Sequence, residues 1–309
     1  MQPKNIGITK LNDIDIAQIV PFIHWTFFFM AWRLNGKYDD IHKAVCDCGA
    51  CKLEWLQSFV PAEREKAEEA LKLYQDALEM LRRFQAEKIL TINAMVGIYP
   101  AHSEDEDIVV NYQHEKIRIP TLRQQIPASD GFCYALADFI KPEEDYMGVF
   151  ANTVIGAEKF CEDFEKDDDM YHSILIKVLA DRLAEATAEW LHYKVRTEIW
   201  AYNADEKLVI PELFKTHYVG IRPAVGYPSL PDQSIIFSLD KLIDFNASGI
   251  TLTENGAMFP NASVSGLYFA HPRSKYFNIG RIDENQFVDY ARRRGLSPEY
   301  LRKWLAANL

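Results

Sequence analysis

The longest helical pattern in the chain spans residues 169–200. Apolar side chains recur there at steps of three and four residues, and charged residues such as Lys177, Arg182 and Glu189 fill the positions between them. The apolar stripe consists of Ile174, Leu175, Val178, Leu179, Leu183, Ala186, Trp190 and Val195. This spacing predicts one long amphipathic helix.

A second long amphipathic helix is predicted over residues 62–90, and the period then changes. Residues 108–112 and 116–119 flank a short polar stretch and predict a hairpin. Further strands are expected at 132–140, 262–269 and 276–280. Short helices are expected at 284–294 and 298–306, the latter with Ser297 as N-cap and Pro298 as its first residue.

Hairpins outnumber βαβ units in this order of elements, so the fold class is predicted to be α+β with a mostly antiparallel sheet. The chain shows no internal repeat, low-complexity tract or clear linker. We therefore expect a single continuous domain over residues 1–309.

Charge excludes several classes of partner. The formal net charge of −11 disfavours a nucleic-acid binder, which needs a basic face to neutralise phosphates, and a polybasic membrane-surface protein. The apolar run at 20–32 is too short for a membrane span and is expected to lie in a core. The first residues do not resemble a signal peptide, and five cysteines fit a reducing compartment, so a cytoplasmic setting is expected.

Several common catalytic motifs are missing from the sequence. It contains no Gly-x-Gly-x-x-Gly after a strand, no Gly-Lys-Ser/Thr phosphate loop, no His-Glu-x-x-His and no Gly-x-Ser-x-Gly. Cys46, Cys48 and Cys51 form the most metal-like cluster, with His42 four residues earlier. An inert loop is favoured over a metal site or redox chemistry, because no second CxxC pair accompanies the cluster. We therefore assign no metal ligands.

A Pro- and Gly-rich loop at 220–232 is the first candidate site. Three prolines in nine residues forbid regular structure, and long irregular loops inside a domain are often functional. Arg222 offers a fork of donors for a carboxylate, Gly226 allows close approach to the backbone, and Tyr227 offers a ring and a hydroxyl. A rigid turn is the alternative.

Two other places complete the candidate site. Asp138 is a lone carboxylate within the apolar run at 132–140, so it needs a cationic or donor partner; an ion pair with another segment is the structural alternative. Tyr276 and Phe277 could enclose a planar ring, although core packing is the usual role of such residues. An arginine, an acid and aromatic rings beside a glycine loop would suit an amino acid joined to a base.

Read together, these segments resemble the activation domain of cobalamin-dependent methionine synthase, which binds S-adenosylmethionine. The resemblance covers nearly the whole chain, and its most specific string is Arg222-Pro223-Ala224-Val225-Gly226-Tyr227-Pro228. The other matching segments, in order, are 24–32, 122–125, 136–139, 180–186, 262–266, 271–276 and 289–293. It implies a C-shaped α+β domain with a twisted antiparallel sheet flanked by helices, and a ligand in a shallow groove.

The resemblance also implies roles for individual residues. Asp138 would bind the amino or ribose groups of S-adenosylmethionine, and Arg222 its carboxylate. Backbone groups around Pro223, Ala224, Gly226 and Tyr227 would hold the adenine end. The remaining implied contact positions are Tyr276, Phe277 and Glu185. No residue is assigned as an acid–base catalyst.

The family's reaction is a repair step within a methyltransferase system that transfers methyl from 5-methyltetrahydrofolate to homocysteine. An electron from a flavodoxin-like donor and the methyl group of S-adenosylmethionine convert inactive cob(II)alamin to methylcobalamin. The resemblance implies that a cobalamin-binding domain or subunit is the partner, and that this chain alone does not make methionine. The alternative function is a module of the same fold that docks a corrinoid protein without delivering methyl.

One position departs from the family pattern. After Pro231 and Asp232 the family usually has a histidine, whereas this chain has Gln233. If that histidine assists docking on the cobalamin domain, the resemblance does not extend this role to Gln233. The cysteine cluster at 46–51 has no counterpart in the family pattern either.

Overall fold

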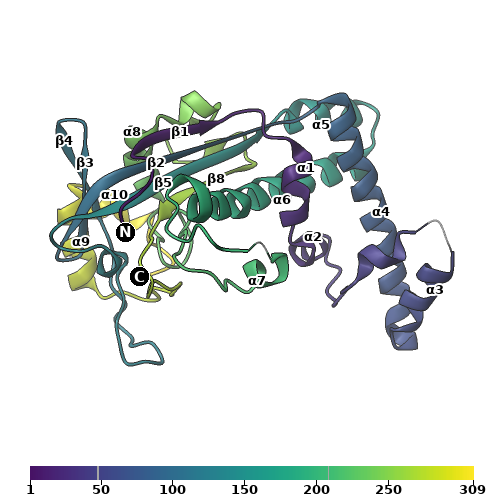
Figure 1. Cartoon of the computed structure of the whole chain (residues 1–309), viewed down its shortest axis with the longest axis horizontal. Helices are drawn as coiled ribbons and strands as arrows, with labels where there is room; N and C mark the ends of the chain where they lie inside the picture. Colours follow the sequence, from purple (N-terminus) through teal and green to yellow (C-terminus); the bar gives the residue numbers. More distant parts are fainter. Residues whose placement is uncertain (47–48, 208) are drawn as a thin grey trace. The chain divides into compact units, whose positions relative to one another are not determined.

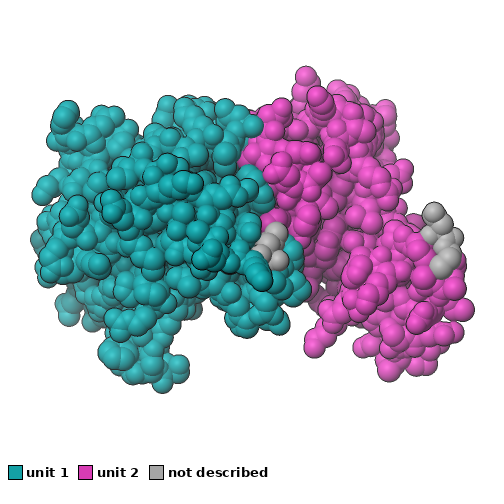
Figure 2. All heavy atoms as spheres, in the orientation of Figure 1, with its two compact units in different colours: residues 1–12, 93–153, 187–309 teal, residues 13–92, 154–186 magenta. Residues whose placement is uncertain are grey.

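The computed structural model describes residues 1–46, 49–207 and 209–309, and the chain divides into two compact units (Figure 2). Unit 1 comprises residues 1–12, 93–153 and 187–309. Unit 2 comprises residues 13–92 and 154–186. Each unit has its own buried residues and is described by itself. The single domain expected over 1–309 stays a prediction.

The main sheet lies mostly in unit 1 and has the strand order β4-β3-β2-β5-β8, with β1 paired to β2 (Figure 1). Its strands are β1 Gly7–Leu11, β2 Thr91–Glu104, β3 Asp107–Tyr112, β4 Glu115–Pro120, β5 Asp145–Ile155 and β8 Ser263–Tyr268. The pairs β1–β2, β2–β3, β3–β4 and β5–β8 are antiparallel. A separate two-stranded sheet pairs β6 Thr251–Leu252 with β7 Met258–Phe259. The α+β prediction is confirmed.

The predicted hairpin is formed by β3 and β4, with Tyr112 opposite Glu115 and Ile108 opposite Ile119. Only Gln113 and His114 connect the two strands, and Gln113 has a φ of 53°. The strand at 262–269 is confirmed as β8, whose Gly148–Tyr268 and Thr153–Ser263 pairs set its register on β5.

The core of unit 1 lies between the sheet and α8 Ile236–Ile243. Buried side chains of Met95, Val149 and Leu267 from the strands belong to one cluster with Leu239 and Leu242 of α8. A second cluster unites α9 Glu284–Arg294 and α10 Pro298–Arg302 with the segment around Leu122 and Ile279. The short helix α7 Ile210–Phe214 is also part of unit 1. Apolar burial of this extent is the main stabilising contribution to the unit.

The helices of unit 2 are α1 Ile16–Ile19, α2 Trp25–Ala31, α3 Gly49–Gln57, α4 Arg64–Glu87, α5 Ala157–Lys166 and most of α6 Met170–Lys194. Helix α4 confirms the prediction at 62–90. The apolar run at 20–32 is core only in part, because Phe28 and Phe29 are buried whereas Phe27 and Met30 are about half exposed. No helix among the described residues is long and apolar enough to cross a membrane.

The strongest predicted helix is confirmed as α6, but its last turn has a wider geometry. Residues Val195–Ile199 form a π-helix, in which the Trp200 N–H donates to the Val195 carbonyl at 2.9 Å. Single π-turns inside long helices are frequent at functional sites. Of the two C-terminal helices, α9 is confirmed, and α10 begins at Pro298 with Ser297 capping it but ends at Arg302 instead of residue 306.

The strand predicted at 132–140 is wrong. Residues Leu136–Phe139 form a 3₁₀ helix, and pairing is limited to a single bridge between Ala135 and Arg123. The Asp138 carboxylate accepts the Ala135 N–H at 2.9 Å, which closes the first turn. The run is apolar because Leu136, Ala137 and Phe139 are buried. A helical turn buries such side chains as well as a strand does.

The strand predicted at 276–280 is also absent. The Ile279 N–H donates to the Pro228 carbonyl, and the Asn278 carbonyl accepts from the Gln124 side chain. Gly280 has a φ of 68°, outside the extended region. The backbone groups of this segment are therefore satisfied by loops and side chains in place of a neighbouring strand.

Candidate functional site

The loop that follows Gly220 runs along β8. The Ile221 N–H donates to the Phe269 carbonyl and the Phe269 N–H donates to the Ile221 carbonyl, both at 3.0 Å. Further along, the Val225 N–H donates to Ser265 at 2.9 Å. Gly266 permits this close approach, since a Cβ there would lie 2.3 Å from the Pro223 carbonyl oxygen. The loop is therefore irregular, as predicted, yet rigidly attached to the sheet.

The turn at Gly226 has a φ of 83°, which glycine adopts without strain. The Gly226 N–H donates to Leu230 at 2.9 Å and the Tyr227 N–H donates to Ala224 at 3.2 Å. Pro223 and Ala224 are buried, whereas Tyr227 is half exposed. Because the N–H groups of Val225, Gly226 and Tyr227 all donate within the protein, these residues could hold a ligand only through carbonyl oxygens or the Tyr227 side chain.

The guanidinium of Arg222 lies in an ion pair within unit 1. Its Nη2 donates to Oε2 of Glu189 on α6 at 2.6 Å, and the two side chains are only 16% and 11% exposed. Burial by itself lowers the pKa of Arg222, but the nearby Glu189 carboxylate and the Tyr276 and Tyr218 hydroxyls outweigh it and raise the pKa. Arg222 therefore stays a cation beside its acid.

Glu189 belongs to a stripe of buried polar residues at 189, 192 and 196, which helical spacing places on one face. The His192 ring stacks on Tyr268 with centroids 5.2 Å apart, and burial followed by the charges of Arg196 and Arg222 lowers its pKa well below 6.5. Arg196 forms a bidentate ion pair with Glu206, in which Nε and Nη2 each donate to one carboxylate oxygen at 2.7 Å. A neutral imidazole therefore lies near two paired cations, Arg196 on the helix and Arg222 on the loop.

Sequence reasoning missed Glu189 as a site residue. Its signal was available, because Glu189, His192 and Arg196 stand at steps of three and four, the spacing of one helix face. Ionisable residues on a buried face need partners, so such a stripe indicates a polar network.

Tyr276 and Phe277 connect the two halves of the predicted site. The Tyr276 hydroxyl accepts the Arg222 backbone N–H at 3.0 Å. The next ring, Phe277, lies 6.3 Å from Phe139 and 6.0 Å from Tyr134, centroid to centroid. Phe139 follows Asp138 directly, so consecutive residues contact the Arg222 loop on one side and the Asp138 turn on the other.

Asp138 has the cationic partner that its sequence context requires, but it is not buried. Both carboxylate oxygens accept from Arg123, each at 2.8 Å, and the two side chains are 34% and 31% exposed. Arg123 also donates to Glu106 at 2.7 Å and to the Cys133 carbonyl at 2.9 Å. The expectation of a buried carboxylate is corrected, since the 3₁₀ turn directs Asp138 outward while its neighbours face the core.

The remaining predicted features are Glu185, Gln233 and the cysteine cluster. Glu185 is half-buried on the portion of α6 in unit 2, and its role stays a prediction. Gln233 begins a 3₁₀ helix at Gln233–Ile235 and donates to the Gly256 carbonyl at 3.5 Å. Of the cysteine cluster, Cys46 is exposed and Cys51 is partly buried, and Cys48 lies outside the described residues. The described residues contain no group of three His, Cys, Asp or Glu side chains that could hold a metal.

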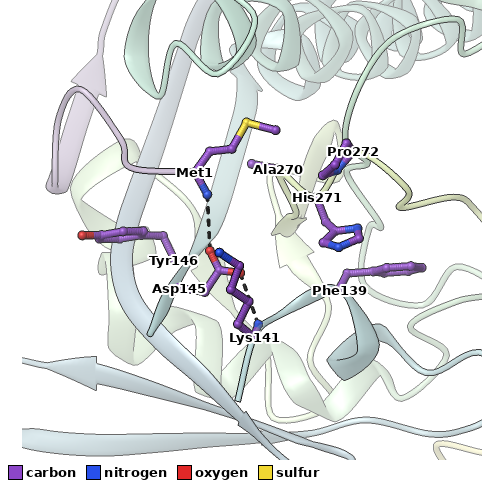
Figure 3. Close-up of a pocket in the computed structure, with 8 residues that line it drawn as sticks. All are labelled: Met1, Phe139, Lys141, Asp145, Tyr146, Ala270, His271 and Pro272. Atoms are coloured by element: carbon purple, nitrogen blue, oxygen red, sulfur yellow. Dashed lines mark hydrogen bonds and ion pairs between the residues drawn. The ribbon is translucent and has the colours of Figure 1, made fainter. Parts of the chain in front are cut away.

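A cavity of about 280 Å³ lies in unit 1 beside this site (Figure 3). Its lining comprises Met1, Phe139, Lys141, Asp145, Tyr146, Ala270, His271 and Pro272. The Phe139 ring lies 5.9 Å from His271 and 6.3 Å from Phe277, so Phe139 is the link between cavity and site. None of the predicted contact residues lines the cavity, and it is not assigned to the ligand.

Comparison with known proteins agrees with this architecture. Residues 15–295 match the family described as "Vitamin B12 dependent methionine synthase, activation domain". A solved structure, described as the crystal structure of the MetH reactivation domain bound to AdoHcy, is 38% identical and superposes with a TM-score of 0.89. The match covers 100% of this chain and 92% of that chain. The chain therefore belongs to the family of activation domains of vitamin B12-dependent methionine synthase.

Proposed function

We propose that this chain binds S-adenosylmethionine in unit 1 and presents its methyl group for the reductive methylation of cob(II)alamin held by a partner domain. The main support for this proposal is the similarity to a reactivation domain bound to AdoHcy, which covers the whole chain at 38% identity. AdoHcy is S-adenosylmethionine without the methyl group, so one site can serve both molecules. The partner and the methyl transfer are proposals that follow from the family.

The residues present fit such a ligand. Arg222 would take the carboxylate, and its Nε is buried without a hydrogen-bond partner among the described residues. Asp138 would take the amino or ribose groups through the remaining lone pair of Oδ1, because Oδ2 already accepts from Arg123 and from the Ala135 N–H. Tyr276 and Phe277 would supply ring faces, and carbonyl oxygens around Ala224 and Gly226 would accept from the adenine amino group. Glu185 is proposed as a further polar contact.

The chain's task in this function is positioning. Bound S-adenosylmethionine supplies a methyl group on a positively charged sulfur, and no proton leaves when that group is transferred. A general base is therefore unnecessary, and the side chains act by fixing the ligand's orientation. The cobalamin and an electron from a flavodoxin-like donor would come from partners. Membership in a methionine synthase family supports a role in methionine biosynthesis and a cytoplasmic setting.

Calorimetry with S-adenosylmethionine and AdoHcy tests the binding. The wild-type protein should release or absorb measurable heat, and Arg222→Ala should weaken affinity about 100-fold, since it removes a charge-assisted contact worth about 2–3 kcal/mol. Absence of heat at millimolar ligand would refute the proposal. Glu198→Ala, which removes a surface acid paired with Lys194 at 2.6 Å, should leave the affinity unchanged.

The methyl transfer needs a separate assay. The chain, mixed with a cobalamin-binding domain of methionine synthase and a chemical reductant, should convert cob(II)alamin absorbance to that of methylcobalamin when S-adenosylmethionine is added. Binding to the cobalamin domain without this conversion would favour the docking module instead. The chain alone, given homocysteine and methyltetrahydrofolate, should make no methionine.

A further inference from the structure

The ion pair between Arg222 and Glu189 is only partly formed. A single hydrogen bond joins Nη2 to Oε2 at 2.6 Å. Glu189 Oε1 and Arg222 Nε are both buried and have no partner among the residues that the structure describes. The Arg196–Glu206 pair in the same unit shows the alternative, because there both Nε and Nη2 donate to the carboxylate at 2.7 Å.

The different geometries indicate different tasks. A forked pair uses the hydrogen-bonding edge of the guanidinium and leaves little capacity for a further anion. A pair joined at one nitrogen fixes the side chain but leaves other donors uncommitted. Arg222 therefore keeps its Nε uncommitted. In Arg196, which is fully buried and stacked 4.1 Å over the Tyr218 ring, Nε is bound to Glu206 and the buried donor without a partner among the described residues is Nη1.

The surroundings of Arg222 make an anchor necessary. Among the described residues, Glu189 is the acid whose charge raises the pKa of Arg222, and the other contributions that raise it come from the Tyr276 and Tyr218 hydroxyls. A buried guanidinium without an acid is strongly destabilised, so without Glu189 this orientation of the Arg222 side chain would no longer be favoured. The backbone of Arg222 would remain in place, because the Tyr276 hydroxyl and β8 hold the loop.

We propose that Glu189 is a positioning residue for the carboxylate of S-adenosylmethionine, acting by holding the Arg222 guanidinium in its binding orientation before the ligand arrives. The inference rests on the proposed function, since it assigns the ligand carboxylate to Arg222. Arginine has large rotamer freedom, and a side chain that is already ordered loses less entropy when the ligand binds. Glu189 itself need not contact the ligand.

Two ligands separate this role from a general structural one. S-adenosylmethionine carries the carboxylate, and decarboxylated S-adenosylmethionine lacks only that group. In calorimetry, Glu189→Gln should lower the affinity for S-adenosylmethionine at least about ten-fold. It should lower the affinity for decarboxylated S-adenosylmethionine less than about two-fold. Glu189→Asp keeps the charge on a shorter stem and should restore part of the lost affinity. Glu198→Gln, which changes an exposed acid in the π-turn that follows α6, should change the affinity for neither ligand.

Each outcome decides the inference. Equal weakening of both ligands by Glu189→Gln, or no weakening of S-adenosylmethionine, would overturn it, as would wild-type protein that binds the two ligands equally. If circular dichroism shows that Glu189→Gln does not fold, Glu189→Asp decides the question. It should lower the affinity for S-adenosylmethionine about three-fold and leave that for the decarboxylated ligand unchanged. Failure of both variants to fold would make Glu189 merely structural. Wild-type protein that binds neither ligand would instead refute the proposed function.

Discussion

Arg222 and Asp138 are predicted to hold opposite charges of one ligand, and the protein already pairs both of them. The Arg222–Glu189 pair is largely buried and is joined by one hydrogen bond. The Arg123–Asp138 pair is about one-third exposed and is joined by two. Water screens the exposed pair and competes with it, whereas the buried pair has no such substitute. Similar ion pairs therefore differ in what their loss would do.

The comparison teaches that good geometry and a large contribution to stability are separate properties. Asp138 has the better hydrogen bonds, but either partner could be solvated if the other were removed. Arg222 has the poorer geometry, yet removing Glu189 would leave a charge in an environment that cannot solvate it. The following predictions test that difference, in order of decreasing expected effect.

The largest effect is expected from Glu189→Ala. It should lower the free energy of unfolding by about 3–5 kcal/mol, because it leaves an uncompensated buried cation. Urea denaturation followed by circular dichroism measures the change. Glu198→Ala, which breaks an exposed pair, should stay within about 0.5 kcal/mol of wild type. If Glu189→Ala lowers the free energy of unfolding by less than about 1 kcal/mol, Arg222 is solvated by other groups. The two ion pairs would then not differ in the way described.

Acidification should weaken the buried cluster through His192. Its pKa is lowered by burial and then by Arg196 and Arg222, so below pH 6.5 the unfolded chain binds a proton that the folded chain does not. Stability should therefore fall as the pH decreases from 6.5, by at most about 1.4 kcal/mol per pH unit from this residue. Unfolding curves of wild type and His192→Gln between pH 7.5 and 5 measure the difference. Parallel pH profiles for the two proteins would contradict this prediction.

A smaller effect is expected at the exposed pair. Asp138→Asn keeps an oxygen that can accept the Ala135 N–H but removes the charge opposite Arg123, so the loss should be about 1 kcal/mol. The same denaturation experiment applies, with Asp163→Asn, from an exposed pair with Lys166, as the matched control. A loss as large as that of Glu189→Ala would mean that exposure does not distinguish the two regions.

Salt should produce the smallest effect and the sharpest contrast. Raising the salt concentration from 0.1 M to 1 M shortens the Debye length from about 10 Å to about 3 Å and weakens exposed pairs more than buried ones. The stability difference between wild type and Asp138→Asn should shrink by up to about 0.5 kcal/mol. The stability difference between wild type and Glu189→Ala should remain nearly constant as the salt concentration rises. Equal salt sensitivity of the two variants would refute the assignment of one pair as screened.

Much of the fold follows from local pattern. The helices at 64–87 and 170–194 are long and strongly periodic, and the hairpin of β3 and β4 has apolar residues on both sides of a short polar turn. The two strand predictions that failed, at 132–140 and 276–280, were short apolar segments. Such segments are compatible with any conformation that buries their side chains, and in both cases loops and a 3₁₀ turn satisfied the backbone.

The candidate site divides in the same way. Arg222, Asp138, Tyr276 and Phe277 were identified from the sequence because their residue types and family motifs indicate a zwitterionic, planar ligand. Their partners were not, because Glu189 and Arg123 are distant in sequence from the residues that they hold, by 33 and 15 positions. No local pattern encodes such a pairing.

The sequence by itself therefore determined the fold class, the long helices and the chemical types present at the site, since these depend on local spacing and residue chemistry. Only the tertiary structure decided that Arg222 is buried against Glu189, that Asp138 faces outward against Arg123, and that Tyr276 and Phe277 join the two. The physical reason is that burial and charge pairing are set by which distant segments pack together, and they decide how strongly each charge is held.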